Sequence, residues 1–380
     1  MHRGIGLLTL RPGQLGGSET LVRGLLSSLG EAEGEDRYTV VSGARGAASL
    51  RPLARGPVRV RTLGSWRAGR GPATQGLAIA RGRYAGGALR RELGDEALDA
   101  VHYPLTVPVP ALAAPKVVTV LDLQHEVMPE FFSPLERIFR RVFYGGAIRE
   151  ASVVVTISEY CRATIVERHG VDPARVLVSL QAVDRRVFRR DPDPEDAARL
   201  AGLAIPERFV VYPANAWPHK NHDRLVDALA QVGDRELGLV LTGQPYGRWP
   251  ELRARAERLG LGERVRHLGY VERGVLPALY RRAGGMVFPS LFEGLGIPPL
   301  EAIACGCPVA AADRAALPEM LRGRALLFDP ERVEAIAAAI DALTGRAQRA
   351  PEPEPAFWER FTWAAAARTH REAYRLASRP

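Results

Sequence analysis

The sequence predicts an α/β protein with two domains, each built around a doubly wound parallel sheet. Three observations support this fold class. Short apolar runs alternate with longer amphipathic segments, which is the pattern of repeated strand–helix units. The chain has 380 residues, a length that suits about two domains. A stretch rich in charge and proline, residues 185–196, interrupts the alternation and is typical of an interdomain linker.

In the first half, we expect strands at the apolar runs and helices at the amphipathic segments. The expected strands are residues 4–10, 38–41, 99–104, 116–122, 152–159 and 176–179. The expected helices are residues 19–29, with Ser18 as N-cap, 131–151 and 160–168. Residues 42–95 are arginine-rich and poorly periodic, which favours solvated loops and one basic helix.

The second half alternates more regularly. The expected strands are residues 209–213, 237–241, 265–268, 286–288, 308–311 and 325–328. Helices are expected near residues 222–232, 249–259, 274–283, 298–305 and 331–343, and a last one at 361–376. We place the first domain at 1–190, the linker at about 185–207, the second domain at 208–355 and a C-terminal helical segment at 356–380.

The composition limits the classes of binding partner that we expect. The net charge of +9 favours anionic partners such as nucleotide phosphates or anionic lipid. No zinc-finger, basic–aromatic or heptad-linked basic pattern is present, so we expect no nucleic-acid binding. Three cysteines cannot build a disulfide framework, and no apolar run approaches the length of a membrane span. We expect a cytoplasmic protein, free or peripheral at the inner face of the membrane.

The helix expected at 131–151 is the segment in which we consider a contact with the membrane. Its apolar residues include Leu135, Ile138 and Val142, and arginines occupy its polar face. A basic amphipathic helix can lie on an anionic membrane. Packing of the apolar side into the core, with an arginine-rich outer face, is the commoner arrangement and the one we favour.

Residues 286–306 are the most informative stretch of the second half, because they combine a strand, a glycine turn and the start of a helix. Gly294 and Gly296 permit a tight turn, and prolines follow at the first helical positions. A helix N-terminus binds phosphate through free N–H groups. Glu293 lies in the loop and Glu301 one turn into the helix, where a carboxylate can accept hydrogen bonds from ribose. Either glutamate alone would be an ordinary solvated residue, so the prediction rests on the whole pattern.

This stretch resembles the Glu-x7-Glu signature of retaining glycosyltransferases of the GT-B fold, in family four, which includes bacterial mannosyltransferases. The resemblance implies two Rossmann-like domains facing a central cleft, with the last helix crossing back to the first domain. It also implies that Glu293 holds hydroxyls of the donor sugar and Glu301 the ribose. The diphosphate would then contact the backbone of the turn, at Gly294, Leu295, Gly296 and Ile297.

A second segment of the same half resembles the family's Arg-x4-Lys-Asn element, whose cations hold the donor diphosphate. Lys220 stands at the lysine position, and Asn215 stands where arginine is usual. His219 or His222 is expected to supply part of the missing charge. Only one other lysine, Lys116, occurs in this arginine-dominated chain, so Lys220 is more informative than an exposed loop lysine would be.

Three further segments resemble family elements. Tyr270 and Val271 stand in the loop that packs on the donor base, and Gly16 and Gly17 match a Gly-Gly-x-Glu loop that faces the donor. The family often has His-Asp after a strand of the first domain.

Where the family has His-Asp, this chain has Leu121 and Asp122. His125, three residues after Asp122, is our candidate for the missing histidine. Asp191 and Asp193 resemble a metal-binding Asp-x-Asp motif, but they lie in the proline-rich linker, so we discount a metal site there.

The resemblance implies a retaining, metal-independent glycosyltransferase with a nucleotide-sugar donor and a glycan, lipid-linked or small-molecule acceptor. The residues expected to act in catalysis are Glu293, Lys220, Asp122 and His125. GDP-mannose is the first choice of donor, with UDP-sugars and dTDP-rhamnose as alternatives. Nucleotide-sugar 2-epimerisation and a non-catalytic nucleotide-sugar-binding subunit remain as other functions.

Overall fold

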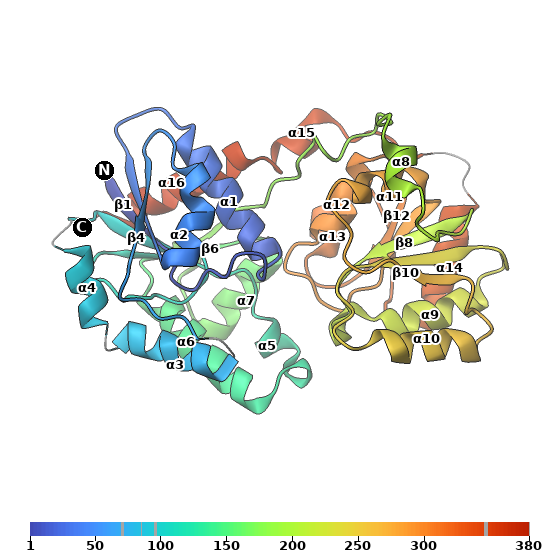
Figure 1. Ribbon diagram of the computed structural model, residues 1–380, viewed down its shortest axis with the longest axis horizontal. Helices are drawn as coiled ribbons and strands as arrows, with labels where there is room; N and C mark the ends of the chain where they lie inside the picture. The colour runs from blue at the N-terminus through green and yellow to red at the C-terminus, as the bar shows by residue number, and fades with distance from the viewer. Residues whose placement is uncertain (70–71, 85, 95–96, 346–348, 380) are drawn as a thin grey trace. The chain divides into compact units, whose positions relative to one another are not determined.

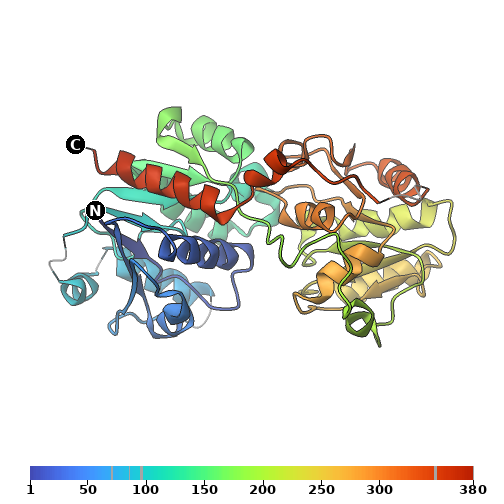
Figure 2. The same ribbon diagram turned by 90° about the horizontal axis from the view of Figure 1, so that it is seen from above.

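The computed structural model describes residues 1–69, 72–84, 86–94, 97–345 and 349–379, which fold into two compact units (Figures 1 and 2). Unit 1 comprises Met1–Ala182 together with Glu359–Pro380, and unit 2 comprises Val183–Trp358. The chain therefore leaves unit 1 eight residues before the end that the sequence suggested for the first domain. Residues 185–207, expected to be a linker, belong to unit 2.

Unit 1 contains a seven-stranded parallel sheet of order β3-β2-β1-β4-β5-β6-β7. Its strands are β1 (His2–Gly6), β2 (Arg37–Ser42), β3 (Val58–Thr62), β4 (Ala100–Tyr103), β5 (Lys116–Thr119), β6 (Val153–Thr156) and β7 (Val176–Val178). The strand order reverses direction between β1 and β4. In open parallel sheets, this switch point is where ligands bind, at the carboxyl ends of the strands.

The helices of unit 1, among them the unpredicted α5 (Gln124–Val127), differ from prediction in several places. They are α1 (Gly17–Gly30), α2 (Ala44–Leu50), α3 (Pro72–Tyr84), α4 (Gly87–Leu93), α5 (Gln124–Val127), α6 (Pro134–Glu150), α7 (Glu159–His169) and α16 (Trp363–Ala377), with 3₁₀ turns at Arg51–Leu53, Pro129–Phe131 and Pro173–Arg175. Gly16, at φ +50°, occupies the N-cap of α1, so the prediction of Ser18 there is wrong. The prediction of loops and one basic helix for residues 42–95 is also wrong, because the described part of this range contains α2, β3, α3 and α4.

Strand β3 escaped prediction because it is an edge strand. Only Val58 of its five residues is buried, and two arginines alternate with its apolar residues. It therefore lacks the continuous apolar run by which buried parallel strands are recognised.

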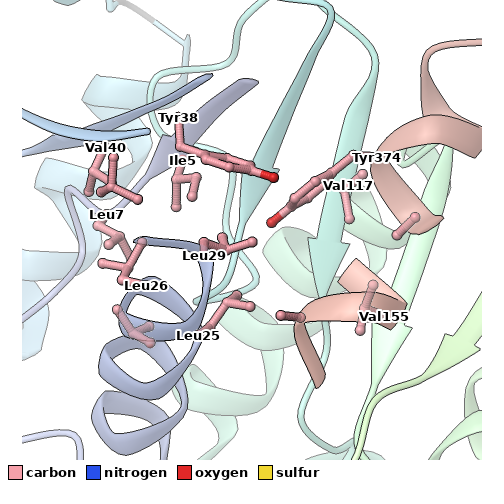
Figure 3. Packing of buried hydrophobic residues seen from close by; sticks show 14 of the residues in the cluster. Ile5, Leu7, Leu25, Leu26, Leu29, Tyr38, Val40, Val117, Val155 and Tyr374 are labelled. Carbon is pink, nitrogen blue, oxygen red and sulfur yellow. The ribbon is translucent and has the colours of Figure 1, made fainter. Parts of the chain in front are cut away.

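The core of unit 1 joins the two ends of the chain (Figure 3). Leu25 and Leu29 of α1 pack beside Ile5 of β1 and Tyr374 of α16. The Tyr374 hydroxyl lies 2.9 Å from Nδ1 of His102 on β4, so the polar tip of this buried tyrosine has a partner. Burial of each such apolar side chain contributes about 1.5–3 kcal/mol to stability. Helix α16 is thus part of the first folding unit although it is last in the sequence.

Unit 2 contains a six-stranded parallel sheet of order β10-β9-β8-β11-β12-β13. Its strands are β8 (Phe209–Pro213), β9 (Gly238–Thr242), β10 (Val265–His267), β11 (Gly285–Phe288), β12 (Val309–Ala312) and β13 (Leu326–Phe328). All six lie within two residues of the predicted bounds. The switch point here falls between β8 and β11.

Helices cover both faces of this sheet (Figure 1). The helices are α8 (Asp196–Leu200), α9 (His222–Gln231), α10 (Trp249–Arg258), α11 (Val275–Arg282), α12 (Ile297–Ala304), α13 (Leu317–Leu321), α14 (Val333–Thr344) and α15 (Pro355–Glu359), with a 3₁₀ turn at Pro218–Lys220. Helix α9 packs against α10 and α14 on one face, and α12 packs against α11 and α13 on the other. Short helices α8, α13 and α15 were not predicted, because five residues give no clear period.

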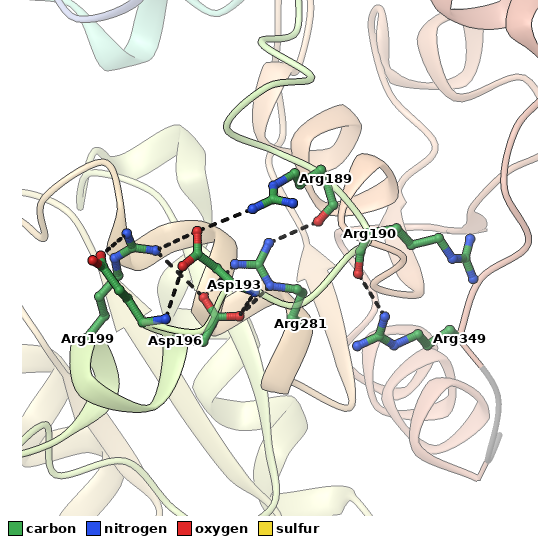
Figure 4. Close-up of polar contacts among 8 residues, drawn as sticks. Arg189, Arg190, Asp193, Asp196, Arg199, Arg281 and Arg349 are labelled. Atoms are coloured by element: carbon green, nitrogen blue, oxygen red, sulfur yellow. Dashed lines mark hydrogen bonds and ion pairs between the residues drawn. The ribbon is translucent and has the colours of Figure 1, made fainter.

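The segment expected to be a linker is held to unit 2 by charge (Figure 4). Arg281 of α11 binds both carboxylate oxygens of Asp196, at 2.6 and 2.5 Å. The Asp193 carboxylate lies 3.4 Å from Arg199 and accepts the backbone N–H of Glu195 at 3.0 Å. The Asp193 carboxylate therefore contacts an arginine and a backbone N–H group of its own segment.

Candidate active site

The switch point of unit 2 brings together the two residues for which we predicted the main roles from the sequence. Lys220 follows β8 and Glu293 follows β11, and Lys220 Nζ lies 2.5 Å from Glu293 Oε1. Both side chains are largely buried. Backbone bonds fix the two loops, since Leu291 N–H donates to the carbonyl of His219 at 2.8 Å. Residues 73 positions apart thus form one charge-assisted pair.

Helix α12 starts immediately beyond this pair. Gly296 is its N-cap with φ +88°, and a Cβ there would lie 2.5 Å from Cδ2 of Leu317. Both the backbone conformation and the packing therefore require glycine. Ile297 is the first helical residue and Pro298 the second, where the missing N–H costs little. The turn Gly294, Leu295, Gly296 and Ile297 leads into a helix N-terminus beside Lys220, an arrangement suited to an anion.

Glu301 lies one turn into α12, as the sequence suggested. Burial raises the pKa of this carboxyl to about 7, while the nearby Arg273 opposes the rise. A carboxyl that is poorly solvated gains most from hydrogen-bond donors supplied by a ligand. Its position and its shifted pKa both fit the predicted ribose contact.

The histidines flanking Lys220 do not supply the missing charge. Burial lowers the pKa of His219 to about 3 and that of His222 to about 4, with the Lys220 charge adding to both shifts. Both rings are therefore neutral at neutral pH, and the expectation of a second cation there is wrong. Asn215 has a different function, because its Oδ1 accepts the N–H of Gln244 at 2.8 Å and ties the loop after β8 to the loop after β9.

The loop after β10 carries Tyr270 and Val271. Tyr270 is 74% exposed, and Val271 is half-buried. The carbonyl of Gly269 accepts the N–H of Gly243 at 2.8 Å, which fixes this loop to the end of β9. An exposed aromatic ring on an anchored loop is available to stack on a planar ligand.

Unit 1 contains a cavity of about 350 Å³ that is lined by one of its candidate residues, Asp122. It lies at the carboxyl ends of β1, β4 and β5, next to the switch point of this sheet. It is lined by Thr9, Leu15, Ser18, Ile79, Leu105, Thr106, Val107, Leu121, Asp122, Phe139, Arg140 and Tyr144. The lining combines one carboxylate, one guanidinium, three hydroxyl side chains of Ser or Thr, five aliphatic side chains, and the rings of Phe139 and Tyr144. This chemistry suits a small polyhydroxylated ligand.

Asp122 is the predicted residue that reaches this cavity. Its Oδ1 accepts the N–H of Gln124 at 3.0 Å, which orients the carboxylate at the strand end. Sequence reasoning missed Arg140, whose guanidinium carbon lies 4.8 Å from the ring centre of Phe132. It also missed Thr106, a non-glycine residue at φ +66°. Arg140 was hidden among several arginines of one helix, and nothing in the sequence marks the backbone of Thr106.

His125 lies in a different environment from Asp122. Its ring is buried, 5.4 Å from the ring of Tyr144 in an edge-on contact, and it does not line the cavity. Burial lowers its pKa to about 4. The geometry favours a packing role for His125 over the predicted catalytic one.

Gly16 and Gly17 lie exposed at the start of α1, and a Cβ at either would meet no atom within 4 Å. This turn is open, unlike the packed turn at Gly296. Leu15 and Ser18 on its two sides line the cavity, so the predicted glycine loop borders the same site as Asp122.

No group of three or more His, Cys, Asp or Glu side chains suited to a metal ion occurs in the part of the chain that the structure describes. Within the same residues, no helix has both the length and the apolarity to cross a membrane.

Comparison with known proteins agrees with this architecture. The model of Glycosyltransferase Family 4 matches residues 15–186, and that of Glycosyl transferases group 1 matches residues 201–349. The first match covers most of unit 1, and the second lies within unit 2. The chain belongs to the family-four, group 1 glycosyltransferases. Both models describe glycosyltransferases, and the fold is the predicted GT-B fold of two Rossmann-like domains.

Curated relatives carry related names. O-antigen chain mannosyltransferase B of Escherichia coli is 30% identical over 234 residues, covering 59% of this chain and 60% of that protein. D-inositol 3-phosphate glycosyltransferase of Segniliparus rotundus is 31% identical over 292 residues, covering 74% of this chain and 63% of that protein. The matched region thus spans about 60% of the length of these relatives.

Solved structures share the fold over nearly the whole chain. Anabaena HepE, solved with UDP and glucose, has a TM-score of 0.72 at 21% identity and covers 98% of each chain. Sucrose-phosphate synthase from Thermosynechococcus elongatus has a TM-score of 0.74 at 19% identity, covering 99% of this chain and 98% of that one. At such identities the likeness concerns the fold.

Proposed function

We propose that this protein is a retaining glycosyltransferase that moves a sugar from a nucleotide-sugar donor to a hydroxyl of an acceptor. The observation that carries the proposal is the Lys220–Glu293 pair beside the N-terminus of α12. A cation and a helix N-terminus suit a diphosphate, and a carboxylate suits sugar hydroxyls. In this proposal the donor binds unit 2.

Charge stabilisation is the main contribution that we assign to these residues. When the bond between the sugar C1 and the phosphate oxygen breaks, negative charge grows on the leaving diphosphate. Lys220 Nζ and the N–H groups at the start of α12 would stabilise that charge, an effect worth about 3–4 kcal/mol per preorganised donor. Glu293 would hold the sugar hydroxyls and Glu301 the ribose.

The reaction itself needs no further catalytic group in this proposal. The acceptor oxygen forms its bond to C1 on the face from which the phosphate leaves, so the anomeric configuration is retained. The acceptor proton passes to the leaving phosphate oxygen, which balances the charge of both products. A divalent metal is not required, because Lys220 and the helix N-terminus act on the same oxygens.

The cavity of unit 1 is our candidate for acceptor binding. Asp122 can accept hydrogen bonds from acceptor hydroxyls, and Arg140 can donate them. A volume of about 350 Å³ suits a ligand of one or two sugar rings in size.

We propose GDP-mannose as the first donor to test. The name of the Escherichia coli relative, a mannosyltransferase of O-antigen chains, supports mannose and an acceptor in surface polysaccharide or glycolipid assembly. UDP-sugars are the second choice, since HepE was solved with UDP and glucose.

We further propose that unit 1 contacts the inner face of an anionic membrane through α3 and α6. Exposed apolar side chains gather on these helices, namely Leu77, Tyr84, Leu135, Ile138 and Val142, and arginines 81, 137 and 141 are exposed among them. The two helices are adjacent, since the rings of Tyr84 and Phe143 lie 6.3 Å apart. Leu135, Ile138 and Val142 were expected in the core, and their exposure makes an apolar and basic surface that suits anionic lipid.

Sedimentation with vesicles tests the membrane contact. The protein should bind phosphatidylglycerol vesicles and not phosphatidylcholine vesicles, and binding should weaken with salt. Ile138→Glu should abolish binding, whereas Leu259→Glu, at an exposed site in unit 2, should not. Equal binding by both variants would contradict this contact.

Product analysis tests the transferase activity. The protein is incubated with GDP-mannose, EDTA and methyl mannoside or an extracted glycolipid, and released GDP and new glycosidic products are measured. The proposal predicts acceptor-dependent GDP release and an α-linked product. Free epimer without acceptor would indicate a 2-epimerase. Donor binding with neither hydrolysis nor transfer would indicate a non-catalytic subunit.

A further inference from the structure

A second cavity of unit 1 has a volume of about 260 Å³ and is lined by residues of α3, of α4 and of the loop after β3. We call it the α3–α4 groove. Its apolar lining residues are Trp66, Leu77, Ala78, Ala88 and Leu89. Arg67 and Arg81 also line it, and no carboxylate occurs among its described lining residues. The groove therefore suits a ligand that is apolar along its length and anionic at one end.

The Trp66 ring is a fixed apolar wall of this groove. It is 9% exposed and belongs to the buried cluster that includes Ile79 and Leu89. A Cβ at Gly82 would lie 2.7 Å from Cζ3 of Trp66, and a Cβ at Gly43 would lie 2.6 Å from its Cδ1. Glycine at both positions lets α3 and the chain after β2 pack directly on the ring. The wall is thus part of the core and needs no ligand to form.

The loop that carries Trp66 and Arg67 is tied to α4. The carboxylate of Glu92 accepts the N–H of Gly64 at 2.6 Å and that of Ser65 at 3.0 Å. Arg67 donates to the carbonyl of Gly64, which fixes its guanidinium to the same loop.

The two arginines of the groove keep their charge available. Among the residues that the structure describes, no carboxylate forms an ion pair with Arg67 or Arg81. Buried arginines elsewhere are paired, since Arg83 binds Glu150 and Arg281 binds Asp196. An anionic group at the groove would therefore meet two cations that no carboxylate of the protein neutralises.

The groove is continuous with the surface that we propose faces the membrane. Leu77, which is 71% exposed, and Arg81 belong to both. Both residues lie on α3, so a lipid that meets this surface also meets the groove. A membrane lipid carries a hydrocarbon chain and a phosphate, which are the two chemistries that the groove accommodates.

We propose that the α3–α4 groove holds one hydrocarbon chain of an anionic membrane lipid, whose phosphate binds Arg67 and Arg81. This inference rests on the proposed membrane contact of unit 1 and specifies what that contact recognises. The chain packs on Trp66 and Leu89, and each buried CH₂ group adds affinity. Because the groove has a limited volume, it buries only a limited length of chain.

Calorimetric titration with n-alkyl phosphates of increasing chain length, kept below their micelle-forming concentrations, tests the groove. Affinity should rise about fourfold for each CH₂ group and stop rising once the groove is full. Alkyltrimethylammonium ions of equal chain length should bind more weakly, because the arginines repel them. A rise that continues with chain length, or equal affinity for both head groups, would overturn the proposal.

Variants locate the binding site. Ala88→Phe fills part of the groove and should weaken decyl phosphate roughly tenfold, whereas Ala364→Phe, at an exposed alanine of α16, should bind like the wild type. Arg67→Ala should weaken alkyl phosphates up to about fivefold without weakening the alkyltrimethylammonium series. The change in tryptophan fluorescence on binding should be lost in Trp66→Phe. Unchanged binding by Ala88→Phe would place the chain elsewhere and overturn the proposal.

Two further measurements separate this inference from the proposals on which it rests. A wild-type protein that sediments with phosphatidylglycerol vesicles but shows no plateau with chain length would overturn the groove and leave the membrane contact standing. A wild-type protein that binds neither vesicles nor alkyl phosphates would overturn both. Release of GDP with methyl mannoside should be the same for Ala88→Phe and the wild type, so a failure of the transferase proposal would appear in both proteins alike.

Discussion

The two units carry their candidate residues at the same place in the same kind of sheet, yet the two places differ in character. At the switch point of unit 2, Lys220 and Glu293 are paired at 2.5 Å, and the turn at Gly296 is packed against Leu317. At the switch point of unit 1, a cavity of about 350 Å³ is open beside Asp122, and a Cβ at Gly16 would meet no atom within 4 Å.

This difference suggests a division of labour. Stabilising a diphosphate requires charges that are already oriented, because reorganisation during the reaction would lose much of their effect. Accepting a sugar or a lipid-linked glycan requires shape and hydroxyl partners more than charge. We infer that unit 2 supplies the fixed electrostatics and unit 1 the adaptable pocket.

The largest effect is expected from Glu293→Gln. The amide keeps the shape of the side chain but loses the charge that orients Lys220 and binds sugar hydroxyls, so kcat should fall about 100-fold. Affinity for the nucleoside diphosphate should change little, because phosphate contacts remain. Steady-state kinetics and calorimetry measure the two quantities, and near-normal turnover would refute the role of Glu293.

The buried carboxyl of Glu301 should also make the stability of the protein depend on pH. Burial raises the pKa of Glu301 from 4.5 to about 7, so the folded state binds a proton that the unfolded state releases between these values. Wild-type stability should therefore fall as pH rises from 4.5 to 7, by at most about 3 kcal/mol relative to Glu301→Gln. Urea unfolding of both proteins at pH 5 and pH 8 measures this. An equal difference between them at both pH values would contradict the assignment.

A smaller and more selective effect is expected in unit 1. Arg140→Ala removes a donor from the cavity and should raise the acceptor KM about tenfold, with the donor KM unchanged. Arg137→Ala, at an exposed site of the same helix, is the matched control with a soluble acceptor. Similar changes in both KM values would break the division of labour between the units.

The sequence predicted unit 2 well because its signals are local. Buried parallel strands such as β8 appear in the sequence as continuous apolar runs. Glu293, Gly296 and Glu301 lie within one strand–turn–helix element, so the pattern that predicts a phosphate site is contained in one short stretch. The same local signal cannot show that Lys220 contacts Glu293, since that contact follows from strand order in the sheet.

Unit 1 was predicted less completely because its site is assembled from distant segments. The cavity draws on Thr9, Thr106, Asp122 and Arg140, which belong to four different segments. Asp122 was found because it ends a strand, whereas Arg140 has no distinguishing neighbour in the sequence. His125, our candidate for the missing histidine, does not line the cavity, and sequence distance does not reveal that its ring is buried and meets Tyr144 edge-on.

The most direct test of the central claim is donor binding without metal. Thermal shifts are measured for the wild type and Lys220→Met with GDP-, UDP-, dTDP- and ADP-sugars, in the presence and absence of EDTA, with Lys116→Met as the matched lysine control. We predict that one nucleotide raises the melting temperature of the wild type and the control equally with and without EDTA, and that Lys220→Met loses the shift. A shift that requires metal, or that survives in Lys220→Met, would contradict a donor site built on Lys220 and α12.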